Sequence, residues 1–106
     1  MNIIRNKIIP FGYAKYINIF GVLFCKPKAK VSEIDINHES IHIAQMKELW
    51  YIGFYILYLM EFLYKLIALR NAHEAYRNIS FEKEAYKFER YLFYLKEREC
   101  FAMWKL

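Results

Sequence analysis

The sequence has 106 residues, of which 58% are hydrophobic and 20% aromatic, so the chain can bury a core and is not typical of a disordered protein. Its length predicts a single domain over residues 1–106, with a β-rich part over 1–31 and a helical part over 32–106. The net charge of +5 suits an acidic surface such as anionic lipid. Since no nucleic-acid-binding motif accompanies that charge, we expect no nucleic acid as a partner.

The two cysteines, Cys25 and Cys100, lie far apart, and neither belongs to a Cys-x-x-Cys pair. This spacing argues against a disulfide framework or a cysteine zinc site, so we expect reduced and buried thiols. The N-terminal residues lack the long apolar segment and the small-residue cleavage site of a secretory signal. We therefore expect a cytoplasmic protein, which can be associated with the cytoplasmic face of the membrane.

The first 31 residues are predicted to form a short β-hairpin or meander. Residues 16–25 (YINIFGVLFC) are rich in β-branched and aromatic side chains and predict a strand, in which Gly21 can mark a bulge or a kink. The KPKAK segment at residues 26–30 predicts a turn, and a second short extended piece is expected near Val31.

Helices are predicted in the remainder of the chain, which gives a mostly helical α+β fold. The first helix covers residues 34–49. Ser32 is its expected N-cap, and Glu33 and Asp35 place negative charge in the first turn, where it complements the helix dipole.

A second helix is predicted over residues 54–69 and a third from a cap at Asn78 or Ser80 to about residue 99. Residues 70–78 (RNAHEAYRN) predict a polar connection between them. The third helix carries an apolar stripe at alternating spacings of four and three, formed by Phe81, Ala85, Phe88, Leu92 and Leu95.

The second predicted helix also has some features of a membrane segment. Residues 49–60 contain no charged side chain, but this run is shorter than the ~20 residues that cross a bilayer. Its aromatic residues suit either a protein core or a membrane interface. We expect a buried core helix, with contact between the aromatic helix over residues 50–64 and a membrane surface as the alternative.

The first predicted helix carries His38, Glu39 and His42 in the order H-E-x-x-H. On a helix the two histidines lie one turn apart and project from one face, which is the spacing that lets two imidazoles share one Zn²⁺. Glu39 lies on the flank of that face, where it can accept a proton from a metal-activated water without binding the metal. The alternative is that both histidines lie at the surface and that Glu39 pairs with a lysine.

A catalytic zinc site needs a third protein ligand and an open fourth position. His73 lies in the predicted polar connection, and Glu82 and Glu84 lie in the first turns of the third predicted helix. Helical periodicity does not choose between the two glutamates, because both flank the apolar stripe and Glu84 is somewhat nearer its centre. All three candidates stay open on this ground.

HESIH at residues 38–42, followed by EKEAYKF at residues 82–88, resembles the motifs of the gluzincin metallopeptidases. In that family HExxH is followed by a glutamate ligand on a later helix, within E-x-x-A-D or E-x-x-A-N. The short minigluzincin-like and antirepressor-like peptidase domains share this phrase. The resemblance implies a minimal zincin-like core with zinc as cofactor. It makes His38, His42 and Glu82 the ligands and Glu39 the general base, and by this alignment Glu84 is not a ligand. Without the resemblance, Glu84 stays the alternative third ligand.

The same resemblance implies that the chain hydrolyses a peptide or protein substrate. Tyr86 stands where the family has Asp or Asn, which orients a ligating histidine, and a neutral phenol there would leave that histidine less basic. An edge strand from residues 16–24, or the piece near Val31, is implied to align the substrate by strand addition. His73, Tyr76 and Arg77 are candidates for the donor that stabilises the oxyanion.

Two other outcomes are compatible with the sequence. The chain can be a latent peptidase whose C-terminal residues 100–106 fill the cleft. It can also be a non-catalytic module that binds a membrane surface or a protein partner and has a degenerate or structural metal site.

Overall fold

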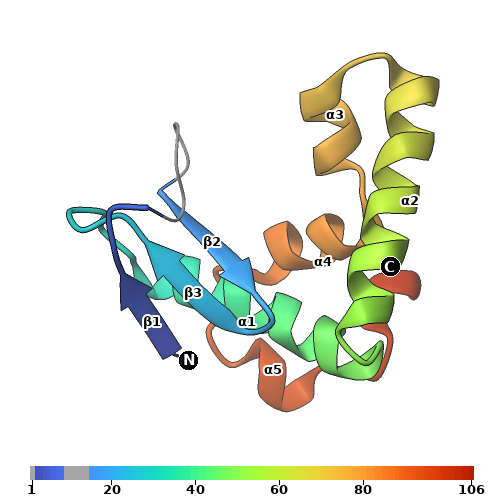
Figure 1. Ribbon diagram of the computed structural model, residues 1–106. Helices are drawn as coiled ribbons and strands as arrows, with labels where there is room; N and C mark the ends of the chain where they lie inside the picture. Colours follow the sequence, from blue (N-terminus) through green and yellow to red (C-terminus); the bar gives the residue numbers. More distant parts are fainter. Residues whose placement is uncertain (1, 9–14) are drawn as a thin grey trace.

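The computed structural model describes residues 2–8 and 15–106. In it a small N-terminal sheet is followed by helices, which confirms the predicted mostly helical α+β fold (Figure 1). The elements are β1 (Asn2–Arg5), β2 (Tyr16–Ile19), β3 (Val22–Cys25), α1 (Glu33–Glu48), α2 (Ile52–Leu69), α3 (Ala72–Arg77), α4 (Ser80–Phe88), α5 (Tyr94–Glu97) and a 3₁₀-helix η1 (Ala102–Trp104).

The sheet is three-stranded with the order β1-β3-β2, in which β1 is parallel and β2 antiparallel to β3. The predicted single strand over residues 16–25 is wrong, because the chain reverses at Phe20 and Gly21, whose φ angles are 51° and 89°. Two residues with positive φ make the tight turn that suits the twist of a hairpin. The turn at residues 26–30 is confirmed, whereas the piece near Val31 is not a strand.

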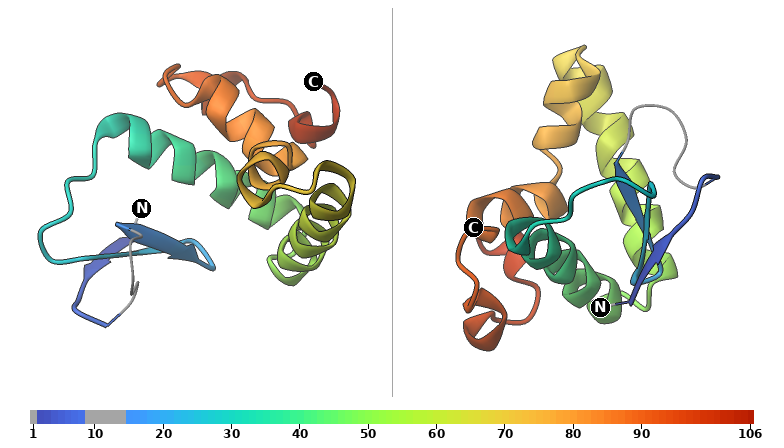
Figure 2. Two further views of the ribbon diagram at one scale, coloured as in Figure 1. Left: turned by 90° about the horizontal axis from the view of Figure 1, so that it is seen from above. Right: turned by 90° about the vertical axis from the view of Figure 1, so that its left-hand side faces the viewer.

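α1 begins where the sequence predicts, because Ser32 and Asp35 form a capping box. Ser32 Oγ accepts a hydrogen bond from the Asp35 N–H at 3.1 Å, and Asp35 Oδ2 accepts one from the Ser32 N–H at 3.0 Å. Two further bonds join β2 to this helix: Tyr16 O–H donates to Asp35 at 2.9 Å, and Asn18 Nδ2 donates to the Glu39 carbonyl at 3.3 Å. Figure 2 shows the sheet on one side of α1 and α4 on the other.

α2 is not the buried core helix that we expect from the sequence. Phe54 is the one buried residue of this fully described helix, and most of its large apolar side chains are exposed. The predicted connection over residues 70–78 is also wrong in part, because it contains α3, which lies beside α2 (Figure 1). Asn71 caps α3 by accepting a hydrogen bond from the Glu74 N–H at 3.0 Å.

The third predicted helix is shorter than expected, because α4 ends at Phe88 and the chain turns before α5. Asn37 of α1 explains this end: its Nδ2 lies 3.2, 2.8 and 3.0 Å from the carbonyl oxygens of Phe88, Glu89 and Tyr91. These carbonyls therefore have a partner other than a continuing helix. Of the predicted stripe, Phe81 and Ala85 are buried and Phe88 is partly buried, whereas Leu92 and Leu95 are exposed.

The C-terminal residues pack against α4 and the core. None of residues 100–106 lines the cleft beside His38 and His42, which a latent enzyme would require. Met103 of η1 belongs to the main core cluster together with Met46, Phe54, Ile79 and Phe81. The two cysteines are free; Cys25 is buried, but Cys100 is exposed, contrary to expectation.

Candidate metal centre

His38, Glu39 and His42 project from α1 into a cleft of about 520 Å³ that β2, α2, α3 and α4 also line. All three side chains are buried, and one potential ligand atom from each lies within 4.8 Å of the others. The helical spacing of H-E-x-x-H thus brings the three groups to one place, as the sequence predicts. The group could hold a metal ion.

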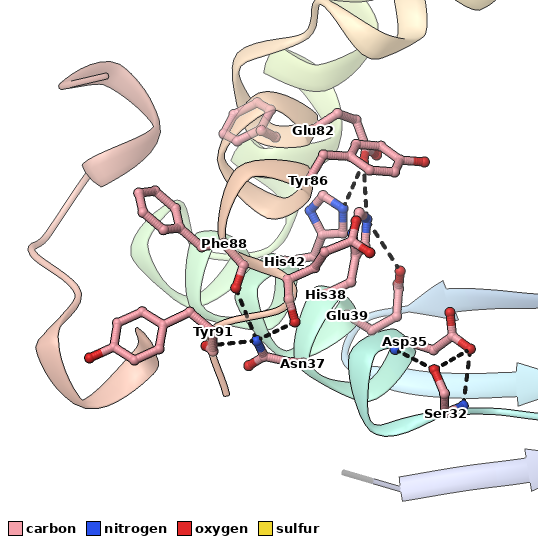
Figure 3. A network of polar contacts seen from close by, with 12 residues as sticks. Ser32, Asp35, Asn37, His38, Glu39, His42, Glu82, Tyr86, Phe88 and Tyr91 are labelled. Carbon is pink, nitrogen blue, oxygen red and sulfur yellow. Dashed lines mark hydrogen bonds and ion pairs between the residues drawn. The ribbon is translucent and has the colours of Figure 1, made fainter. Parts of the chain in front are cut away.

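Glu82 reaches the same place from α4 (Figure 3). Its Oε1 lies 3.3 Å from His38 Nε2 and 3.1 Å from His42 Nε2. Its other oxygen, Oε2, accepts a hydrogen bond from the Tyr58 O–H of α2 at 2.7 Å. Two imidazoles of α1 and a carboxylate of α4 therefore lie within a few ångströms of one another.

The charges of this cluster are strongly coupled. Burial opposes a charge on His42, but the neighbouring Glu82 carboxylate outweighs that cost and raises the pKa of His42 to about 9. Burial also disfavours ionised Glu82, but His42, His38 and Tyr58 hold the pKa of its carboxyl well below the usual range. In the metal-free protein at neutral pH, protonated His42 supplies the positive charge that a bound cation would otherwise bring.

This coupling predicts how the metal-free protein responds to pH. Because the pKa of His42 is raised from 6.5 to about 9 on folding, its stabilising charge is fully present below pH 6.5 and is lost as the pH rises through 9. We expect the free energy of unfolding in chelator to fall by up to about 3 kcal/mol over that range. Denaturant titrations across this pH range measure it. A Glu82→Gln variant should lose most of the dependence, and a wild-type stability that does not change with pH would contradict the coupling.

His42 is oriented by Gln45, which sequence reasoning missed. Gln45 is fully buried one turn after His42, and its Oε1 lies 2.8 Å from His42 Nδ1. Its Nε2 donates to the Phe81 carbonyl and to Glu84 Oε1, both at 3.0 Å, so the amide oxygen is fixed toward the imidazole. With Nδ1–H donating to Gln45, the Nε2 of a neutral His42 is free to bind a metal. A polar amide at position i+3, on the same helical face as His42, was the available signal.

Glu84 takes part in a different network from that of the histidine pair. It is fully buried, and its oxygens accept hydrogen bonds from Arg98 Nε at 2.6 Å, Tyr94 O–H at 2.6 Å and Gln45 Nε2 at 3.0 Å. Arg98 also reaches Glu48 Oε1 at 2.9 Å. This network joins the C-terminal segment to α1 and α4, and it explains the burial of Glu84 without a metal.

Removing Arg98 should therefore destabilise the protein. In Arg98→Met, the Glu84 carboxylate would stay buried without its cation, and we expect a loss of about 3 kcal/mol in the free energy of unfolding. Urea denaturation measures this loss. The double variant Arg98→Met/Glu84→Gln should recover part of it, because the orphaned charge is removed. A single variant as stable as the wild type would contradict the structural role given to this pair.

Tyr86 does not take the place of the Asp or Asn found in gluzincins. Its ring packs edge-on against the His38 ring, with centroids 4.6 Å apart, and its hydroxyl shares a hydrogen bond of 2.9 Å with the Tyr76 hydroxyl. Glu89, two helical turns after Glu82, instead places Oε1 3.4 Å from His38 Nδ1. Sequence reasoning missed Glu89, although its seven-residue spacing from Glu82 puts both on one face. A carboxylate beside His38 is thus present, one turn later than the resemblance to the gluzincin motif implies.

The three candidate oxyanion donors have different positions. Tyr76 lines the cleft, whereas the Arg77 guanidinium stacks on the Tyr86 ring at 3.8 Å. His73 is exposed on α3 and is not among the described residues that line the cleft. Burial raises the pKa of the Tyr76 and Tyr58 phenols, so both are neutral hydrogen-bond donors at physiological pH.

β2 forms an edge of the described sheet, and three of its residues line the cleft. The Lys26 N–H donates to the Lys15 carbonyl at 3.0 Å, so this pair is one of the hydrogen-bonded pairs of the hairpin. Because such pairs alternate along antiparallel strands, the backbone groups of Tyr16 and Asn18 point away from β3. The Asn18 carbonyl indeed accepts a hydrogen bond from the Tyr55 O–H at 3.3 Å, across that edge.

No protein-family model matches the chain, and no curated protein and no solved structure is significantly similar to it. Fold and site therefore define the class: a small, mostly helical α+β protein with a buried His-Glu-His group in an HExxH-like arrangement that could hold a metal ion.

Proposed function

We propose that this protein is a zinc-dependent peptidase of the gluzincin type. His38, His42 and Glu82 are its metal ligands, and Glu39 is its general base. The observation that supports this most directly is the approach of two imidazole Nε2 atoms to one Glu82 oxygen, at 3.3 and 3.1 Å. Two histidines and a glutamate are a donor set of catalytic zinc sites, which keep one further position open for water or substrate.

The surroundings of the donor set fit a metal site. Gln45 and Glu89 contact the Nδ1 atoms of the two histidines, which leaves both Nε2 atoms facing Glu82. Tyr58 holds the second oxygen of Glu82. Such outer partners fix the orientation and the basicity of metal ligands.

We take Glu39 as the base and not as a ligand. When bound, zinc would lower the pKa of a water molecule to ~7 and polarise the scissile carbonyl. Glu39 lines the cleft, and its Oε2 lies 3.8 Å from His38 Nε2, farther than the Glu82 oxygen does. From there it accepts the proton of the attacking water and passes it to the amine that leaves.

The cleft also offers positions for a peptide. An extended chain can pair with the edge of β2 at Tyr16 and, where it displaces the Tyr55 hydroxyl from the Asn18 carbonyl, at Asn18. In this mode main-chain hydrogen bonds give affinity for many sequences. We assign the oxyanion-stabilising hydroxyl to Tyr76, because among the three candidate donors it is the one that lines the cleft.

An unfolded protein substrate with a self-quenching fluorescent label tests the proposal. We expect the full chain to cleave this substrate when zinc is present. Cleavage should stop after dialysis against a chelator and resume when stoichiometric zinc is added. Zinc binding without cleavage of this substrate or of a peptide library would contradict the peptidase and favour the non-catalytic alternative. A chain that binds no zinc would contradict the metal site itself.

A further inference from the structure

The outer face of α2 is an exposed apolar surface that the metal site does not use. Among the described residues, α2 is the helix that is long and apolar enough to cross a membrane. Only 6% of its residues are buried inside the protein. Its exposed large apolar side chains are Ile52, Ile56, Leu57, Leu59, Met60, Leu63, Tyr64, Ile67 and Leu69.

All of these side chains except Leu69 form a wide band on one side of the helix. With successive residues about 100° apart around the helix axis, Leu59 lies at one edge of this band and Leu57 at the other. The band covers about 160° of the helix surface. The two charged residues of the helix, Glu61 and Lys65, fall on the opposite side by the same spacing. Glu61 Oε2 accepts hydrogen bonds from the Ser80 N–H and O–H, both at 2.8 Å, which places that side against α4.

The width of the band favours lipid over a second copy of the chain as its occupant. A two-helix seam uses the a and d positions alone, which at the centre of the band are Ile56, Met60, Leu63 and Ile67. It would leave the flanking Leu57, Leu59 and Tyr64 in water. A bilayer covers the whole band. Trp50, which is 88% exposed in the turn just before α2, suits the headgroup region, and the net charge of +5 favours an anionic surface.

We propose that this face of α2 docks on the surface of an anionic bilayer, with the helix lying along the interface. The opposite side of α2 carries Phe54, Tyr58 and Glu61, which contact the core, Glu82 and Ser80. Since that side is occupied by protein, one face alone is open to lipid, as in a monotopic helix. This inference does not depend on peptidase activity.

Flotation of the full chain with vesicles of phosphatidylcholine and phosphatidylglycerol tests the docking. We expect the wild type to float with these vesicles, more weakly with phosphatidylcholine alone, and to be released by alkaline carbonate. The double variant Ile56→Glu/Leu63→Glu should bind at least about tenfold more weakly, because both charges would enter the apolar region. Phe93→Glu, which changes an exposed aromatic residue outside α2, is the matched control and should bind like the wild type.

Circular dichroism and a thermal unfolding transition would verify that each variant is folded. The proposal fails if the wild type stays in the aqueous phase, or if the double variant floats equally well. It also fails if the wild type self-associates without binding vesicles and the double variant is monomeric, which would make a second copy the occupant. Resistance to alkaline carbonate would show that the helix spans the bilayer instead of lying on it.

Discussion

Glu39→Gln is expected to lower peptide hydrolysis about a thousandfold while zinc stays bound. Glutamine has nearly the same shape as glutamate, but its amide cannot accept the proton of the attacking water. The proposed metal ligands are His38, His42 and Glu82, so the substitution leaves the proposed donor set unchanged. The rate of substrate cleavage and the zinc content, measured on one sample, separate loss of the base from loss of the metal.

Glu33→Gln provides the matched control, because Glu33 lies on the same helix and is exposed in its first turn. This variant should keep wild-type activity. If Glu39→Gln hydrolysed the substrate at the wild-type rate, Glu39 would not be the base. If it lost its zinc, Glu39 would be a ligand and the assignment of the site would be wrong.

Glu82→Gln is expected to weaken zinc binding about a hundredfold or more. Loss of a residue that only supports a metal ligand typically costs about 10–100-fold in metal affinity. Glu82 is proposed to bind the metal itself, so its loss should cost at least as much. The substitution also removes the negative charge that raises the pKa of His42. Titration with a fluorescent zinc chelator as competitor measures the change.

Glu84→Gln is the control for this experiment, because Glu84 lies two residues later on the same helix and is equally enclosed. It should bind zinc with nearly wild-type affinity but unfold more easily, since Arg98 loses its buried partner. The opposite pattern, with zinc lost in Glu84→Gln and kept in Glu82→Gln, would make Glu84 the ligand.

Local signals predicted the part of the site that lies on one helix. Ser32 and Asp35 mark the start of α1, and the i,i+4 spacing of His38 and His42 puts both on one face, so neither feature depends on distant contacts. The choice between Glu82 and Glu84 could not come from periodicity, because both are buried and only their tertiary partners differ. The motif resemblance favoured Glu82, the glutamate that lies beside the histidines.

Tertiary contacts account for the features that the sequence did not predict. α4 ends at Phe88 because the side-chain amide of Asn37, which lies 51 residues earlier in α1, donates hydrogen bonds to the carbonyl oxygens at this end of the helix. The chain passes from α1 to α2 through Trp50 and Tyr51, whose φ angles of 59° and 60° are rare for bulky residues and have no local signature. The exposure of α2 could not be predicted either, because an apolar helix has the same composition in a core and at a lipid surface.

Zinc-edge anomalous scattering from crystals of the full chain grown with zinc tests the central claim most directly. We predict one peak per chain, ~2.0–2.2 Å from His38 Nε2, His42 Nε2 and one Glu82 oxygen, with Glu39 beside the open position. The absence of a peak between these three side chains, or a peak coordinated by Glu84 instead of Glu82, would contradict it.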